Sequence, residues 1–363
     1  MVVEELDTPA VVVDLDVMER NLVRMANYCR DQSINLRPHN KTHKIPELAR
    51  RQIESGAIGI TVAKVGEAEV MVHSAITDVL IAYPVVGTEK AQRLCRLAER
   101  ARLSVAIDSE AVAVSLSRVA AERGVSLGIL VELDVGVHRC GFANERAALA
   151  LAQAVTDLKG LEFKGLMFYP GHIMDPATPL ELVKQVNDQL DRTYEVFHHA
   201  AIPLRVVSGG STPTAYFSGE FHGVNEIRPG MYPFYDRNML GSQVARLEDC
   251  AVSVIVTVVS TTVPGWAIVD GGSKTFSSDR YLVGDGRGFG MIKEDPNAML
   301  GDLSEEHGHV NISHTQRKYK VGERLSVIPN HVCSTINMHD EIFGIRRNHV
   351  EAKWEVAARG RVR

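Results

Sequence analysis

The stretch Leu103–Leu133 reads LSVAIDSEAVAVSLSRVAAERGVSLGILVEL, and it contains one complete repeat of the pattern on which the fold is built. Its first apolar run predicts a strand over Leu103–Asp108, and its last predicts a strand over Leu127–Leu133. Between these runs, the Ala-rich and charged segment Ser109–Arg123 predicts an amphipathic helix. A strand, a helix and a second strand in this order form a right-handed unit with two parallel strands.

The same alternation recurs through the first two-thirds of the chain. Six further strands are predicted, over Asn35–Pro38, Gly59–Ala63, Asp78–Ile81, Phe163–Met167, Arg205–Ser208 and Glu226–Arg228. Eight strands that alternate with helices favour an α/β fold, a closed (β/α)₈ barrel of the TIM type, and an open doubly wound sheet is the alternative. No GxGxxG follows the first strand and no GxxxxGK[ST] occurs, which removes the usual grounds for a nucleotide-binding domain.

The pattern changes near Gly241. Four β-rich runs follow, over Cys250–Thr262, Trp266–Asp270, Tyr319–Val321 and Arg324–Ile328. Because short turns separate several of these runs, they predict a mostly antiparallel β-domain. We therefore predict two domains, residues 1–240 and residues 241–363. A predicted strand over Ala10–Asp14 precedes a predicted helix over Val17–Arg30, and the sequence leaves open which domain this strand joins.

Composition excludes several classes of protein. The chain has 363 residues, a net charge of −5 and 45% hydrophobic residues, which is enough apolar material for a sizeable core and argues against disorder. The mild acidity argues against nucleic-acid binding, and no apolar run is long enough for a membrane helix. The N-terminus does not resemble a signal peptide, and the five cysteines lie far apart. These features predict a cytoplasmic protein with reduced thiols.

Reactive residue types crowd the end of the first predicted barrel strand. Leu36–Lys44 reads LRPHNKTHK, with two lysines and two histidines. Active sites of such barrels lie at the C-terminal ends of the strands, and a lysine there can form a Schiff base. A solvated basic loop is the alternative, and the pattern itself does not choose between Lys41 and Lys44.

Two glycine-containing turns follow the last two predicted barrel strands. Gly209–Thr214 reads GGSTPT, and Pro229–Tyr232 reads PGMY. Backbone amides and hydroxyl groups in such turns can hold a phosphate, and this is the usual phosphate site of these barrels. A reactive lysine together with a phosphate site on neighbouring strands suggests pyridoxal phosphate.

Larger motifs make the resemblance specific. Pro38–Lys44 (PHNKTHK), with Asp7-Thr8-Pro9 upstream and Lys64–Ala68 (KVGEA) downstream, resembles the fold-type III pyridoxal-phosphate enzymes. Within these it is most similar to the D-threonine aldolase and D-serine dehydratase group, a branch of the alanine-racemase-like fold, over nearly the whole chain. The resemblance implies that Lys41 carries the cofactor, that Arg139 faces its phenolic oxygen and that Tyr169 lines its ring. It also implies a set of phosphate-binding residues, namely Ser208, Gly209, Gly210, Ser211, Thr212, Gly230 and Tyr232.

A second signal lies in the predicted β-domain, where Pro329–Cys333 reads PNHVC. On a strand, alternate residues share a face, so His331 and Cys333 are expected to point the same way. Imidazole and thiolate suit zinc and similar ions, although a buried thiol beside a histidine is the more common arrangement. The resemblance implies that this pair binds one divalent metal ion (Mn, Zn, Co or Mg).

The resemblance implies an aldolase that cleaves D-threonine-like β-hydroxy-D-amino acids, with Lys41 and His172 as catalytic residues. The alternative is a dehydratase of D-serine or D-threo-3-hydroxyaspartate. Aldolases of the group carry Asp at the second metal position and dehydratases carry Cys, so Cys333 favours the alternative, whereas Asn337–Asp340 and Trp354–Gly360 resemble the aldolase branch. A racemase does not need the metal pair, and a non-catalytic pyridoxal-phosphate-binding protein lacks the β-domain. The family also implies a C2 homodimer.

Overall fold

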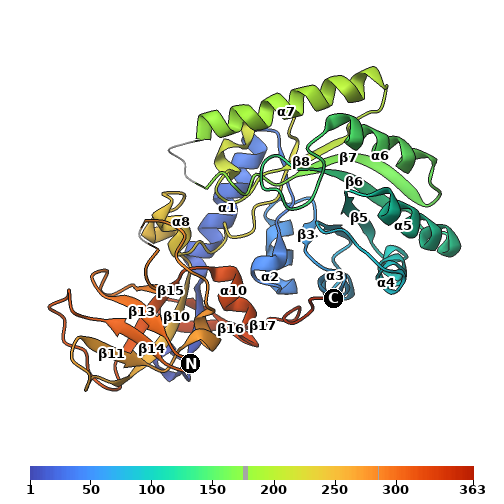
Figure 1. The fold of residues 1–363 in the computed structure, drawn as a ribbon. Helices are drawn as coiled ribbons and strands as arrows, with labels where there is room; N and C mark the ends of the chain where they lie inside the picture. Colours follow the sequence, from blue (N-terminus) through green and yellow to red (C-terminus); the bar gives the residue numbers. More distant parts are fainter. Residues whose placement is uncertain (175–178, 285) are drawn as a thin grey trace. The chain divides into compact units, whose positions relative to one another are not determined.

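The computed structural model describes residues 1–174, 179–284 and 286–363, and the chain divides into two compact units (Figure 1). Unit 1 comprises Met1–Arg24, Thr42–Ile45 and Met231–Arg359. Unit 2 comprises Met25–Lys41, Pro46–Gly230 and Gly360–Arg363. The two units are therefore interleaved along the chain, and helix α1 (Leu15–Asp31) contains the first junction between them.

Unit 2 contains an eight-stranded sheet in which every pair of neighbouring strands is parallel. Its order is β2-β9-β8-β7-β6-β5-β4-β3. The strands are β2 (Asn35–Leu36), β3 (Ile60–Val62), β4 (Asp78–Ile81), β5 (Arg102–Ile107), β6 (Leu127–Leu133), β7 (Leu161–Phe168), β8 (Val206–Gly209) and β9 (Glu226–Ile227). A parallel bridge between His39 and Thr61 joins the two ends of this order, next to a 2.8 Å hydrogen bond from Thr61 N to Pro38 O. The predicted (β/α)₈ barrel is confirmed.

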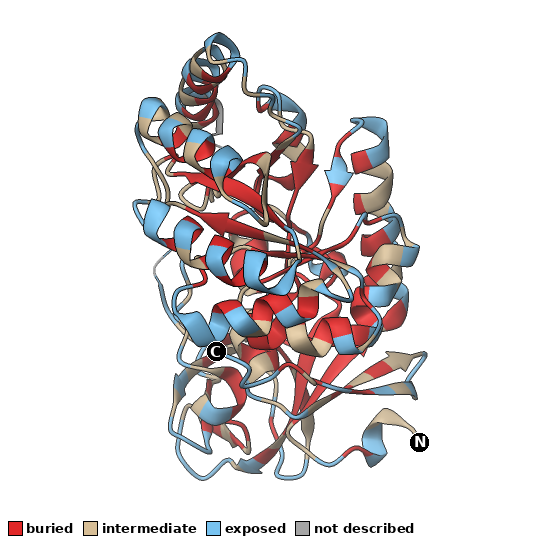
Figure 2. Cartoon of the chain, turned by 90° about the vertical axis from the view of Figure 1, so that its right-hand side faces the viewer, coloured by how far each residue is buried: buried red, intermediate tan, exposed pale blue. Residues whose placement is uncertain are grey.

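Helices cover the outside of the barrel strands. They are α2 (Pro46–Glu54), α3 (Val65–His73), α4 (Thr88–Ala98), α5 (Glu110–Arg123), α6 (Glu145–Asp157) and α7 (Pro179–His199), with a short 3-10 helix, η3 (Ala215–Glu220), after β8. Val79 and Ile81 pack with the helices, whereas the intervening Leu80 belongs to a separate buried cluster with Ala106, Leu130 and Met167. Alternate residues thus face the helices and the barrel interior, and Figure 2 shows buried strands behind exposed outer helix faces.

Unit 1 is built on a nine-stranded sheet of order β11-β14-β13-β12-β15-β10-β1-β16-β17. Its strands are β1 (Ala10–Asp14), β10 (Val252–Ser260), β11 (Trp266–Val269), β12 (Gly290–Ile292), β13 (Met299–Leu303), β14 (Gly308–Asn311), β15 (Arg324–Pro329), β16 (Glu341–Arg346) and β17 (His349–Glu355). Among the described residues, its strands pair antiparallel except β1 with β16, so the mostly antiparallel β-domain is confirmed. The N-terminal strand β1 belongs to this sheet.

Short helices connect the strands of unit 1. They are α8 (Arg237–Gly241), α9 (Ser273–Phe276), α10 (Val332–Asn337), η1 (Val3–Glu5) and η4 (Leu247–Asp249). The predicted strand over Tyr319–Val321 is wrong, because the chain makes a turn there in which Glu323 N donates to Lys320 O and Gly322 takes a φ of +86°. Within the part of the chain that the structure describes, no helix has the length and apolar character needed to cross a membrane.

Candidate active site

Three predicted cofactor residues gather in unit 2 from three different strand ends. Lys41 lies in the 3-10 turn η2 (Asn40–Thr42) after β2, Arg139 lies in the loop after β6, and Tyr169 follows β7 directly. The Tyr169 ring lies 5.9 Å from Lys41 Nζ and 5.0 Å from Arg139 Cζ, measured to the ring centroid. Two cations therefore approach one aromatic ring.

The loop that carries Arg139 is fixed by two aspartates. Asp134 Oδ1 accepts hydrogen bonds from the backbone amides of Gly136 (3.0 Å) and His138 (2.9 Å). Asp108, at the end of β5, accepts from Gly141 N at 3.0 Å. Gly141 has a φ of +99°, and a Cβ there would lie 2.6 Å from the Leu133 carbonyl carbon. This backbone conformation and the close contact favour glycine at position 141. The turn and the bonds to the two aspartates bring the loop with Arg139 back to the end of β6.

His39 is a neutral neighbour of Lys41. Lys41 N donates to His39 Nδ1 at 3.3 Å. Burial holds the pKa of His39 well below its usual range, and the positive charges of Lys41, Arg228 and Arg139 lower it further. The neutral ring accepts this hydrogen bond on Nδ1. Because Lys41, Arg228 and Arg139 all lower the pKa of His39, these three cations lie close to it at this end of the barrel.

His172 packs against the loop that carries Arg139. A Cβ on Gly136 would lie 3.1 to 3.4 Å from three atoms of the His172 ring. Its Nδ1 is buried and has no hydrogen-bond partner among the described residues. Burial lowers the pKa of His172, with Asp134 opposing and His138 adding to the shift. Burial thus disfavours the charged form of this ring, and within the described part of the chain its Nδ1 is left without a partner beside the loop that carries Arg139.

The two predicted phosphate turns touch each other within unit 2. Gly230 N donates to Thr212 Oγ1 at 3.2 Å, and Ser211 N donates to Thr214 Oγ1 at 2.9 Å. Gly210 has a φ of +86°, which favours glycine at this bend. The turns after β8 and β9 therefore lie side by side, as a shared phosphate site requires.

Two residues of the predicted phosphate set have other surroundings. The Ser208 hydroxyl is fully buried, donates to Glu226 Oε1 at 2.5 Å and accepts from Arg228 Nη1 at 2.6 Å. Its one hydrogen is already used, so its side chain has none left to donate to a phosphate. Tyr232 is 1% exposed and belongs to unit 1, whose segment begins at Met231.

The candidate metal pair of unit 1 lies at the start of a helix. The expectation that His331 and Cys333 alternate on a strand is wrong, because β15 ends at Pro329, His331 caps α10 and Cys333 lies in its first turn. The two side chains nevertheless form a hydrogen bond with each other, and Cys333 Sγ lies 3.2 Å from Thr42 Oγ1. The pKa of His331 is raised to about 11, first by the Cys333 sulfur and also by Asp236, against the effect of burial.

Asp236 is a residue of this cluster that sequence reasoning missed. Its Oδ1 accepts from Met239 N in α8 at 3.0 Å, and its Oδ2 accepts from Val332 N in α10 at 3.0 Å. The same Oδ2 lies 3.6 Å from His331 Nδ1. One buried carboxylate thus caps two helices and lies beside His331 of the candidate metal pair. No group of three or more His, Cys, Asp or Glu side chains with metal-site geometry exists among the described residues.

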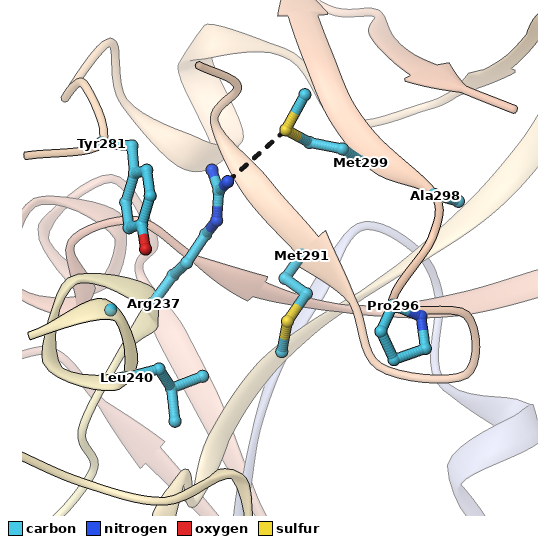
Figure 3. Close-up of a pocket in the computed structure, with 8 residues that line it drawn as sticks. Arg237, Leu240, Tyr281, Met291, Pro296, Ala298 and Met299 are labelled. Carbon is cyan, nitrogen blue, oxygen red and sulfur yellow. Dashed lines mark hydrogen bonds between the residues drawn. The ribbon is translucent and has the colours of Figure 1, made fainter. Parts of the chain in front are cut away.

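A cavity of about 310 Å³ lies in unit 1 (Figure 3). Methionine and aliphatic side chains line it, including Met291 and Met299. The Arg237 guanidinium carbon stacks 3.9 Å above the Tyr281 ring, and Arg237 Nη2 donates to Met299 Sδ at 3.4 Å. Arg237 Nη1 also donates to Asn330 Oδ1 at 3.1 Å, so this side chain braces the residue that precedes His331. No sequence prediction pointed to this cavity.

Comparison with known proteins finds similar family models, relatives and solved structures that together cover nearly the whole chain. The family model of the alanine racemase N-terminal domain matches residues 13–237, and a model of a serine dehydratase domain matches residues 251–345. The D-threonine aldolase of Arthrobacter sp. is 33% identical over 361 residues, covering 98% of this chain and 93% of the relative. The D-threonine aldolase structure from Filomicrobium marinum is 34% identical, with a TM-score of 0.92 and coverage of 99% of this chain and 98% of the other.

The D-threo-3-hydroxyaspartate dehydratase structure from Delftia sp. HT23 is similar to the same degree. It is 31% identical, with a TM-score of 0.90 and coverage of 98% of both chains. Two further structures of a D-threo-3-hydroxyaspartate dehydratase carry single substitutions, one of histidine to alanine and one of a cysteine two positions later to alanine, the latter in the metal-free form. His331 and Cys333 have the same spacing.

Proposed function

The chain belongs to the D-threonine aldolase and D-serine dehydratase family of alanine-racemase-like, pyridoxal-phosphate-dependent lyases, and from this premise we propose that it cleaves β-hydroxy-D-amino acids. The products are glycine and an aldehyde. D-Threonine, which yields acetaldehyde, is the model substrate.

The observation that carries this proposal is the grouping of Lys41 and Arg139 about Tyr169. A primary amine for the cofactor aldehyde, a cation for its phenolic oxygen and an aromatic side chain for its ring fit pyridoxal phosphate. The adjoining turns with Gly210 and Gly230 supply backbone without side chains at the ends of β8 and β9, where such barrels hold phosphate. The residues present therefore fit the cofactor.

Each residue of the barrel site has a defined task. Pyridoxal phosphate, when bound, supplies a ring that accepts the electron pair released at the substrate's Cα. Lys41 supplies the amine that binds the cofactor, and its Nζ returns a proton to Cα of the glycine product. His172 takes the β-hydroxyl proton on its unpartnered Nδ1 as the Cα–Cβ bond breaks and the aldehyde C=O forms. Arg139 would supply a positive charge to the phenolic oxygen of the bound cofactor.

His331 and Cys333 are the residues we propose to hold a divalent metal ion. An imidazole and a thiol in contact suit a borderline-soft ion, and two protein ligands leave coordination positions for water or a hydroxyl group. Such an ion supplies Lewis acidity toward the β-hydroxyl. The spacing shared with the substituted pair of the D-threo-3-hydroxyaspartate dehydratase supports this proposal.

Product identification tests the reaction. The protein, loaded with pyridoxal phosphate and Mn²⁺, should convert D-threonine and D-allo-threonine to glycine and acetaldehyde, which alcohol dehydrogenase detects. L-Threonine should react at least about 100-fold more slowly, because misplacement by an ångström costs roughly that factor. Comparable cleavage of L-threonine would contradict the proposal.

A dehydratase is the second candidate, and Cys333 is the observation that favours it. In that reaction a base removes the Cα proton and the β-hydroxyl leaves, so D-threonine yields 2-oxobutanoate and ammonia. Lactate-dehydrogenase-type detection of the keto acid, run beside the aldehyde assay on one sample, separates the two reactions. Keto acid without glycine would establish the dehydratase and reject the aldolase.

We further propose a C2 homodimer that acts in the cytoplasm. A symmetric dimer is the commonest soluble assembly, and all five cysteines are free thiols, as a reducing compartment allows. Sedimentation equilibrium across a wide concentration range should give twice the 39.9 kDa chain mass. A fully active monomer at high dilution would contradict the dimer.

A further inference from the structure

The interior of the barrel carries a row with three polar side chains where such barrels usually pack branched apolar residues. Strand register aligns Glu132 on β6 with Met167 on β7, Met167 with Ser208 on β8, and Ser208 with Glu226 on β9. Glu132 has the parity of interior-facing Leu130, and register partners in a parallel sheet share a face. Glu132, Ser208 and Glu226 are each at most 4% exposed.

Hydrogen bonds join two members of this row, Ser208 and Glu226, to two arginines, and their donor-to-acceptor direction is fixed. Ser208 Oγ donates to Glu226 Oε1 at 2.5 Å and accepts from Arg228 Nη1 at 2.6 Å. Arg37 Nε donates to Glu226 Oε2 at 2.7 Å, so both oxygens of that carboxylate are occupied. Because a guanidinium only donates and the serine has one hydrogen, the order Arg228 to Ser208 to Glu226 cannot reverse while Glu226 is ionised.

Each end of this chain of bonds is anchored. Arg37 Nη1 pairs with Asp78 Oδ1 at 2.6 Å, and a Cβ on Gly59 would lie 2.5 Å from the same nitrogen, so the glycine makes room for the arginine. At the other end, Arg228 Nη2 donates to Phe168 O at 2.8 Å, next to Tyr169. Arg228 is 6% exposed, and a charge this deeply buried requires partners to remain in place.

The anchored arginine acts on the cofactor end of the barrel. The positive charge of Arg228 lowers the pKa of His39 and that of Glu132, and it interacts electrostatically with Tyr169. Lys41 and Arg139 also lower the pKa of His39. We propose that Glu226 is a positioning residue which, through the Ser208 hydroxyl, fixes the Arg228 guanidinium as a permanent positive charge at the cofactor site. This inference rests on the proposed function only in requiring that the barrel bind pyridoxal phosphate.

The test compares Glu226→Gln and Ser208→Ala with the wild-type holoenzyme. Glu226→Gln removes one buried negative charge, so the pH at which the bound cofactor's absorption band changes should fall by about one unit. Ser208→Ala cuts only the link to Arg228 and should lower kcat about tenfold or more, with a smaller change in KM. The double variant should be no slower than the slower single variant, because both act through Arg228.

Glu162→Gln is the matched control, since Glu162 is a half-exposed carboxylate on β7 that pairs with Lys164 and Arg205. It should keep the wild-type absorption midpoint and kcat. Wild-type midpoints and kcat in both single variants, or additive losses in the double variant, would overturn the inference. If Glu226→Gln does not fold, Ser208→Ala still decides. A wild-type protein that binds no pyridoxal phosphate would instead reject the proposed function.

Discussion

The candidate barrel site and the candidate metal pair are assembled in opposite ways. In unit 2, Lys41, Arg139 and Tyr169 come from the ends of β2, β6 and β7, and different groups fix the turn of Lys41 and the loop of Arg139. In unit 1, His331 and Cys333 come from one helical turn, and a single carboxylate, that of Asp236, caps it. A site spread over many strands tolerates the loss of one support, whereas a site on one turn depends on its cap.

The largest loss of turnover should follow from removing the Lys41 amine, which we propose binds the cofactor. Lys41→Ala should lower turnover by at least about 10³-fold, because both attachment and proton return are lost. Borohydride reduction of the wild-type protein followed by peptide mapping should label Lys41. Lys44→Ala is the control, because Lys44 Nζ is bound to Asn337 Oδ1 at 2.8 Å within unit 1. Label on Lys44 would reverse the assignment.

A smaller loss of aldol cleavage is expected when the candidate metal pair, His331 and Cys333, is changed. His331→Ala should lower aldol cleavage about 100-fold while the cofactor absorption band stays, because pyridoxal phosphate needs none of these ligands. Chelation of the wild-type protein should have the same result. Cys333→Asp should retain activity but shift the metal preference toward a harder ion such as Mn²⁺. Full turnover in a metal-free sample would show that this pair serves another purpose.

A third effect concerns the support of the barrel site. Gly141→Ala should move the Arg139 loop, because its Cβ would lie 2.6 Å from the Leu133 carbonyl carbon at a φ of +99°. We expect about a tenfold loss in kcat/KM and weaker cofactor binding, measured by fluorescence titration. Gly124→Ala, at a helix end with open space around it, controls for the backbone strain alone.

The smallest effect should appear in stability rather than in turnover. Burial raises the pKa of Glu132 to about 7, against the attraction of Arg228 and Arg139 and with help from Asp108 and Asp134. Since the folded pKa exceeds the unfolded value of about 4.3, wild-type stability should fall as pH rises from roughly 4.5 to 7 and then level off. Glu132→Gln removes this dependence.

Melting temperatures of the cofactor-free proteins at pH 5 and pH 8 measure the difference. The wild-type protein should lose a few degrees more than Glu132→Gln between these two values. Equal losses in the two proteins would mean that Glu132 is ionised throughout this range.

The barrel was accessible from sequence because its strands are short, buried and regularly spaced. Leu127–Leu133 and Asp78–Ile81 were predicted with the bounds that the structure has. The cluster of Lys41, Arg139 and Tyr169 followed from the rule that such barrels react at their strand ends, together with the family resemblance. Alternation also reveals the inner row once the register is known, but the register itself depends on contacts between distant strands.

The β-domain site was less accessible for a physical reason. The apolar run before Pro329 continues the strand pattern, and nothing local announces that His331 begins a helix. The group that stabilises this helix start is Asp236, which lies 96 positions away in sequence. Helices as short as α8 and α10 have little intrinsic stability, so such a distant cap decides their existence.

The interleaving of the two units limits how the protein can be recombined. The chain passes between units at five junctions, namely Arg24/Met25, Lys41/Thr42, Ile45/Pro46, Gly230/Met231 and Arg359/Gly360. A chimaera made by one crossover near residue 231 would keep Thr42–Ile45 from the first parent beside Cys333 and Asn337 from the second. Grafting the β-domain of a relative therefore requires that Met1–Arg24 and this four-residue segment, which directly follows Lys41, be exchanged with it.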